Sequence, residues 1–175
     1  MWRIATLAIF MFTRQAIAAG EFDQTGQYTG SYACTPEAAA GISYDLNARA
    51  WAPTGFRVGN TIFYVRVKPT GSQTLFGDSE KFIRYEVQIG DRYHAESQCM
   101  DFSDLPRNLD DIPADLGSMI IGANGSINCA WGRAEYDINL TTLRYVKTYT
   151  FGFSSLTDNT AVVPYIEIGN CISFR

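Results

Sequence analysis

The sequence predicts an all-β fold, an antiparallel meander barrel or a two-sheet sandwich of about nine to ten strands. Two observations predict it. Apolar and polar residues alternate with a period of two over much of the chain, and glycine and proline turn residues separate the alternating runs. The chain has 175 residues, of which 14% are aromatic and only 18% are charged. That composition suits one domain with a substantial core and argues against disorder.

The alternating runs assign residues to faces of the predicted strands. In each run, aliphatic and aromatic residues take every second position, and charged or polar residues fill most of the others. This pattern is typical of antiparallel strands with one buried face. The predicted inward sets are Phe63, Val65 and Val67; Ile83, Tyr85, Val87 and Ile89; and Ala134, Tyr136, Ile138 and Leu140.

One short segment favours a helix near residues 36–40. Thr35 is a good N-cap, Pro36 suits the first helical position, and Glu37 places a carboxylate in the first turn. Three alanines follow, and Gly41 is a suitable terminator. We therefore expect a short helix inserted between two strands.

The start of the chain predicts a secretory signal peptide at residues 1–19. It has a basic start, an apolar run at residues 4–12 and a small-x-small cleavage pattern at residues 16–18. The apolar run is far shorter than the ~20 residues that a membrane span needs. We expect residues 20–175 to form a single all-β domain that is secreted or periplasmic, with no membrane span after cleavage of the signal.

All four cysteines follow the predicted signal peptide: Cys34, Cys99, Cys129 and Cys171. An even number of cysteines in an exported chain indicates two disulfides, because the compartment is oxidising. The sequence has no C-x-x-C motif and no cysteine–histidine pair at ligand spacing. We therefore expect no structural metal site.

An ordered series of matches suggests two diverged half-repeats. Residues 30–34 and 125–129 share the pattern Gly-Ser-x-x-Cys, and residues 44–47 and 136–139 share Tyr-Asp-x-Asn. Each half then ends in a strand-like run that closes with Ile-Gly and is followed by a cysteine. The predicted half-repeats are residues 28–99 and 123–175, joined by an acidic loop at residues 101–117.

The half-repeats favour one disulfide pairing. If each half closes on itself, Cys34 pairs with Cys99, and Cys129 pairs with Cys171. The alternative joins Cys34 to Cys171 and Cys99 to Cys129, which would tie the ends of the domain together. A chance alignment of β-rich sequence is the alternative to the duplication itself.

Four residues of the C-terminal half are candidates to face a ligand: Tyr145, Lys147, Tyr149 and Glu167. Lys147 interrupts an otherwise apolar strand face. A lysine that points into a β-protein needs a carboxylate partner, such as Glu167 on a neighbouring strand, or a ligand anion. The alternative is that Lys147 reaches solvent while its aliphatic stem covers apolar surface.

Motifs of catalysis are missing from the sequence. His94 is the only histidine, and its sequence neighbours are not typical of a catalytic site. The sequence contains no nucleophile elbow, zincin motif, phosphate-binding loop or dinucleotide fingerprint. We expect no catalytic residue, no metal and no cofactor.

Charge and composition narrow the class of function. The formal net charge of −4 argues against a nucleic-acid partner, because phosphate binding needs a basic surface. We expect a non-catalytic binding module for a small ligand or a glycan. One alternative is an envelope protein that binds another protein. A less favoured alternative is a hydrolase that uses paired carboxylates.

Segments at both ends of the predicted domain resemble a group of small exported alphaproteobacterial proteins with four cysteines and no assigned activity. The similar segments are residues 32–45 with Trp51, then Cys129, residues 143–145, Tyr149, residues 152–153 and residues 164–171. That group often has serine at the position of Tyr165. The resemblance implies export and bacterial origin, and it carries over no catalytic residue.

Overall fold

The computed structural model describes residues 22–59, 61–74, 81–100, 118–150 and 163–174. These residues form an all-β protein with ten strands in one antiparallel sheet that is not closed, which confirms the predicted fold class and the approximate strand number. The strands are β1 (Gly30–Asp45), β2 (Ala50–Phe56), β3 (Phe63–Thr74), β4 (Lys81–Asp91), β5 (Ser97–Gln98), β6 (Ser118–Ile120), β7 (Ser126–Trp131), β8 (Ala134–Asn139), β9 (Arg144–Tyr149) and β10 (Tyr165–Phe174).

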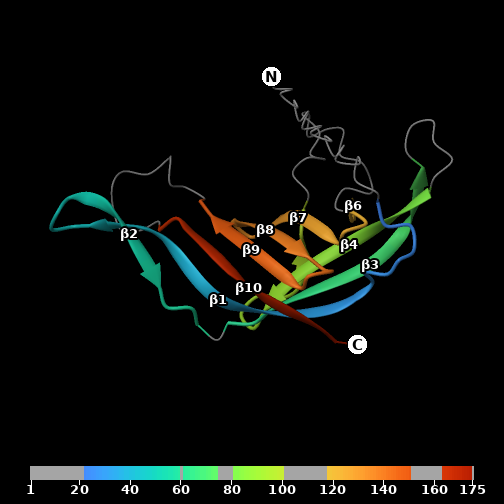
Figure 1. Cartoon of the computed structure of the whole chain (residues 1–175), viewed down its shortest axis with the longest axis horizontal. Helices are drawn as coiled ribbons and strands as arrows, with labels where there is room; N and C mark the ends of the chain where they lie inside the picture. Colours follow the sequence, from blue (N-terminus) through green and yellow to red (C-terminus); the bar gives the residue numbers. More distant parts are fainter. Residues whose placement is uncertain (1–21, 60, 75–80, 101–117, 151–162, 175) are drawn as a thin grey trace, which may run out of the picture.

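The first long strand and the last strand lie together at the centre of the sheet. The strand order is β5-β4-β3-β1-β10-β9-β8-β7, with β2 paired to β1 and β6 paired to β4. Figure 1 shows the sheet as a curved structure from which the β1–β2 hairpin projects at one end. Two runs of neighbouring strands, one on each side of the β1–β10 pair, therefore make up the sheet.

The concave face of this curved sheet forms the hydrophobic core. The predicted inward residues of β3 and β8 are all buried, as are Tyr85, Val87 and Ile89 of β4, while Ile83 is half-buried. Cys34, Tyr136 and Tyr145 belong to the same cluster, so both halves of the sheet contribute to one core. The period-two alternation thus predicted the buried face correctly.

The two edges of the sheet meet at one point beyond β5. Met100 and Ala130 of β7 form an isolated antiparallel bridge with N–O distances of 2.9 and 2.8 Å. Next to it, the amide of Cys99 donates to the carbonyl of Val87 in β4, at 2.7 Å, and Cys99 forms a disulfide with Cys129 of β7. This seam holds the curved sheet in shape although no continuous ladder closes it.

The expected helix near residues 36–40 is wrong, because β1 runs through this segment as a strand. The segment pairs with β10 along one edge, and its later residues pair with β2 along the other. A register shift between Pro36 and Ala38 accommodates Glu37 as a β-bulge. Hydrogen-bonded neighbours outweigh the weak local preference of three alanines for a helix.

The favoured disulfide pairing is also wrong. The disulfides are Cys34–Cys171 and Cys99–Cys129, which is the alternative pairing. Cys34 and Cys171 occupy directly opposite positions of β1 and β10, so their side chains emerge on the same face of the sheet. Two disulfides fit an oxidising environment, either extracellular or periplasmic.

Several sequence predictions concern other parts of the chain. The signal peptide at residues 1–19 and the acidic loop at residues 101–117 lie outside the described residues. The half-repeats stay a prediction: their first matched segments begin β1 and β7, whereas residues 44–47 lie at the end of β1 and residues 136–139 lie within β8. In the described part of the chain, no helix is long and apolar enough to cross a membrane.

Candidate functional site

The four predicted ligand-facing residues gather on the concave face of β9 and β10. In the ladder, Lys147 of β9 stands opposite Glu167 of β10 on one side and Tyr136 of β8 on the other. The Lys147 ammonium nitrogen lies 5.7 Å from the ring centroid of Tyr136 and 5.7 Å from that of Tyr165. These are cation–π distances, so Lys147 lies among tyrosine rings.

Lys147 is half-buried and stays charged. Burial lowers its pKa, but the combined influence of Tyr136, Tyr165 and Glu167 outweighs burial and raises the pKa above the ordinary lysine value. Among the described residues, Lys147 forms no ion pair. The ammonium is therefore stabilised by its ring and hydroxyl neighbours and by a more distant carboxylate.

The tyrosines of this cluster are held in the neutral state. The Tyr145 hydroxyl donates to Oε1 of Glu167 at 3.0 Å, and burial together with this carboxylate raises the pKa of Tyr145 strongly. Burial raises the pKa of Tyr136 to about 12, although Lys147 opposes the shift. Tyr149 stacks on Tyr165 with ring centroids 5.5 Å apart.

The cluster therefore unites all four predicted residues, and two of them, Tyr145 and Glu167, are hydrogen-bonded to each other. Tyr145 is buried against Phe63, with ring centroids 4.9 Å apart, whereas Lys147, Tyr149 and Glu167 are half-buried. These contacts hold the side chains on the concave face of β9 and β10 in place. That the four residues contact a ligand stays a prediction.

A hollow of about 560 Å³ lies on the opposite, convex face, across β7 to β10 and the bulge of β1. Its volume is in the range typical of small-ligand sites. Sequence reasoning missed this groove, because its polar side chains occupy outward positions that are usually solvent-facing. The residues lining this polar groove are Glu37, Ser126, Asp137, Asn139, Arg144, Tyr145, Val146, Ile168, Gly169 and Asn170.

Strand register places the polar side chains of the groove side by side. Arg144 of β9 stands opposite Asn139 of β8 and Asn170 of β10. The Asn170 side-chain amide donates to the Glu37 carboxylate, which the bulge of β1 brings to this place. Val146 and Ile168, directly opposite each other in β9 and β10, add aliphatic surface next to these polar groups.

Two charged groups of the groove are available to a ligand. Within the described residues, neither the Arg144 guanidinium nor the Asp137 carboxylate forms an ion pair or a hydrogen bond. Asn139, by contrast, uses its side-chain oxygen to accept hydrogen bonds from the amides of Thr141 and Thr142, at 3.0 and 2.8 Å. A planar donor and a carboxylate acceptor thus line one groove with spare hydrogen-bonding capacity.

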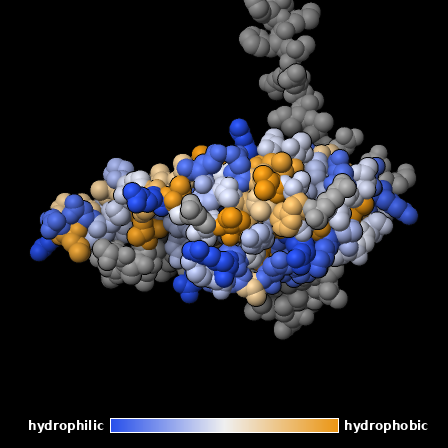
Figure 2. Space-filling model, turned by 90° about the horizontal axis from the view of Figure 1, so that it is seen from below, coloured by the Kyte–Doolittle hydropathy of each residue, from blue (hydrophilic) through white to orange (hydrophobic). Residues whose placement is uncertain are grey.

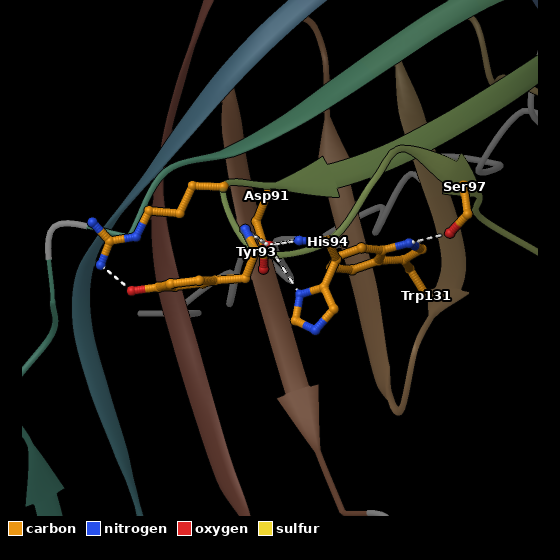
Figure 3. A network of polar contacts seen from close by, with 6 residues as sticks. Asp91, Tyr93, His94, Ser97 and Trp131 are labelled. Carbon is orange, nitrogen blue, oxygen red and sulfur yellow. Dashed lines mark hydrogen bonds and ion pairs between the residues drawn. The ribbon is translucent and has the colours of Figure 1, made fainter.

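His94 lies elsewhere, in the turn that follows β4 (Figure 3). Its Nδ1 is 2.9 Å from Oδ1 of Asp91, which also accepts from the His94 amide at 2.7 Å. Burial raises the pKa of Asp91, but the hydrogen bonds from Tyr93 and His94 outweigh it, and the net pKa is lowered.

Ser97, the nearby hydroxyl drawn in Figure 3, is not placed to act with this pair. The Ser97 hydroxyl accepts a hydrogen bond from the indole of Trp131 at 2.6 Å, and Figure 3 shows it beyond the indole, away from the imidazole. The Asp91–His94 pair therefore stabilises the turn between β4 and β5. The described residues contain no group of three or more histidine, cysteine or acidic side chains that could hold a metal ion.

Comparison with known proteins finds no matching family model, no matching curated protein and no matching solved structure.

Proposed function

We propose that this chain is a non-catalytic binding module for a small hydroxyl-rich ligand or a glycan. The observation that carries the proposal is the polar groove on the convex face, in which Arg144 and Asp137 keep free hydrogen-bonding capacity. Neighbouring hydroxyls of a sugar can accept from a guanidinium and donate to a carboxylate at the same time. The aliphatic surface of Val146 and Ile168 suits the C–H side of such a ligand.

The proposal places this module outside the cytoplasm. Residues 1–19 act as a cleaved signal peptide, and the protein is secreted or periplasmic, in keeping with the resemblance to small exported bacterial proteins. The two disulfides support this location. Mass spectrometry of the exported protein tests it: an intact Met1 would contradict cleavage.

A ligand panel tests the binding function. Purified oxidised protein is titrated with neutral sugars, amino sugars and uronic acids, by calorimetry or by chemical-shift mapping. Binding that is lost in Arg144→Gln but kept in Arg57→Gln supports the polar groove, because Arg57 is exposed and lies outside it. Shifts confined to other surfaces would refute the site.

The same panel tests the hydrolase alternative. Glu37 and Asp137 are two carboxylates that line one groove, which is the minimum that glycoside cleavage needs. Release of reducing sugar by the wild-type protein, abolished in Asp137→Asn, would replace the binding module by a hydrolase.

A protein-binding role is the second candidate, and exposed apolar residues of β10 favour it. Ile166, Ile168 and Ile172 are 46%, 46% and 67% exposed on the convex face. Such residues next to each other on one strand are typical of interaction surfaces. Native mass spectrometry of protein purified from its host separates the two roles, since a second polypeptide in the complex would favour this one.

A further inference from the structure

A second, smaller hollow lies on the convex face near the end of β10. Its volume is about 240 Å³, and its lining includes Tyr64, Arg66, Glu96 and Phe174. Arg66 and Glu96 form an ion pair at 2.7 Å, with 44% and 31% of their side chains exposed. The Tyr64 and Phe174 rings meet edge to face with centroids 6.3 Å apart, and both stay partly open to solvent.

β10 connects this hollow to the polar groove. Alternate residues of a strand share a face, so Ile168, Asn170, Ile172 and Phe174 all point outward, and Cys171 between them is buried. Asn170 lines the groove, and Phe174 lines the smaller hollow. They lie four positions apart, which corresponds to roughly 13 Å along the strand.

The surface between the two hollows is apolar. Ile172 is the exposed residue between them on β10, and the residue opposite it on β1 is Ala33. Tyr64 of β3 stands opposite Ala33 on the other side, so a small side chain lies between an aromatic ring and an isoleucine. Figure 2 shows apolar side chains interspersed with strongly hydrophilic ones on the side of the molecule seen from below in Figure 1.

We infer that the two hollows are subsites for one neutral oligosaccharide that lies along the outer face of β10. This inference rests on the proposed function and extends it from one sugar to a chain. The C–H sides of pyranose rings pack on Tyr64, Phe174 and Ile172. The hydroxyls of the saccharide form hydrogen bonds with Arg66 and Glu96 at one end and with the polar groove at the other.

The pairing of β10 disfavours a peptide in this place. An extended peptide binds a sheet by adding a strand to a free edge. β10 is paired with β1 along its length and with β9 over residues 165–170, so its backbone has no free edge next to the polar groove. A ligand over that part of β10 must therefore be recognised by side chains, as a saccharide is.

Charge disfavours a polyanionic chain. In the smaller hollow, the positive charge of Arg66 is cancelled by the negative charge of Glu96. The polar groove has one positive side chain, Arg144, and two negative ones, Glu37 and Asp137. Two positive and three negative side chains therefore line the track, which leaves a net charge of −1. A chain of uronic acids or sulfated sugars would be repelled, whereas a neutral chain is not.

The test is the dependence of affinity on chain length. Neutral oligosaccharides of one linkage type, from mono- to hexasaccharide, are titrated into the oxidised protein. Affinity is expected to rise by at least about tenfold once the chain reaches both hollows, because the second subsite is then filled intramolecularly. Tyr64→Ala is expected to remove this gain.

Controls separate failure of this inference from failure of the proposed function. Tyr93→Ala removes an aromatic ring that is 67% exposed outside both hollows, and it is expected to bind every chain as the wild type does. Phe174→Ala repeats the Tyr64 test from the other strand, and circular dichroism checks that each variant folds. Monosaccharide binding without any gain from length, or a gain that survives both variants, overturns the extended site and leaves the proposed function intact. The lack of binding to any saccharide overturns both.

Discussion

The two disulfides are expected to contribute unequally to stability. Cys34–Cys171 joins residues 137 positions apart, whereas Cys99–Cys129 joins residues 30 positions apart. A cross-link stabilises mainly by restricting the unfolded chain, and the restriction grows with the length of the loop that it closes. Replacing both cysteines of the longer loop by alanine should therefore cost more free energy of unfolding than replacing both of the shorter loop.

The chain-entropy relation gives the size of the difference. It assigns about 5 kcal/mol to a loop of the longer kind and about 3.6 kcal/mol to one of the shorter kind. The shorter loop is nested in the longer one, but each double variant keeps the other cross-link, so the two losses still differ by about 1.4 kcal/mol. All four sulfur-bearing side chains are at most 3% exposed, so the loss of buried surface is similar in the two double variants.

Guanidinium unfolding, followed by tryptophan fluorescence and by circular dichroism, measures the two losses. The comparison requires coincident transitions and an m-value for each variant, because removal of a cross-link also expands the unfolded state. Equal losses, or a larger loss for the Cys99/Cys129 variant, would refute the entropic reasoning. The second outcome would mean that the seam between Cys99 and β7 stabilises the folded state by itself.

Three further perturbations test other parts of the structure. Gly169→Ala should destabilise by several kcal/mol, because a methyl group there would lie 2.1 Å from a backbone oxygen of β1, whereas Gly55→Ala, with no atom within 4 Å, should be nearly neutral in the same thermal melts. Burial raises the pKa of Asp23, but the hydrogen bonds that its carboxylate accepts outweigh burial and lower the pKa, so the ionised carboxylate stabilises the folded state above about pH 4, and this contribution is lost as the pH falls. In Asp23→Asn, the free energy of unfolding measured in urea should therefore fall less steeply between neutral and acidic pH. Lys147→Met should raise the pKa of Tyr136 further, because the ammonium opposes its upward shift. Titration of tyrosinate absorbance would detect the change, and an unchanged titration would contradict the proximity of the two groups.

The sequence predicted the inner face of the sheet well, because burial on one face imposes a period of two on each strand. Val65, Tyr85 and Ile138 all occupy positions that the alternation assigned to the core, and all are fully buried. This signal is local and independent of which strands are neighbours. It therefore predicts the fold class without predicting the order of the strands.

The errors arose where long-range pairing decides the outcome. Residues 35–41 combine good helix-start and helix-stop residues, but pairing on both edges makes the segment part of β1. The disulfide pairing follows from the central position of β1 beside β10, which no local pattern reveals. The polar groove depends on the bulge that presents Glu37 next to Asn170, residues far apart in the chain. Outward polar residues such as Asp137 otherwise look like ordinary surface.

The central position of β10 has a consequence for how the protein is made. Residues 165–174 are the last of the described chain, yet they supply the neighbour of β1 and the partner of Cys34. A nascent polypeptide that lacks them leaves β1 without its central neighbour and Cys34 without its disulfide partner, so the centre of the sheet can form only after synthesis has reached this strand. Under the export proposed above, a chain whose central strands are still unpaired remains suited to passage through a translocation channel, and the Cys34–Cys171 disulfide forms after that passage.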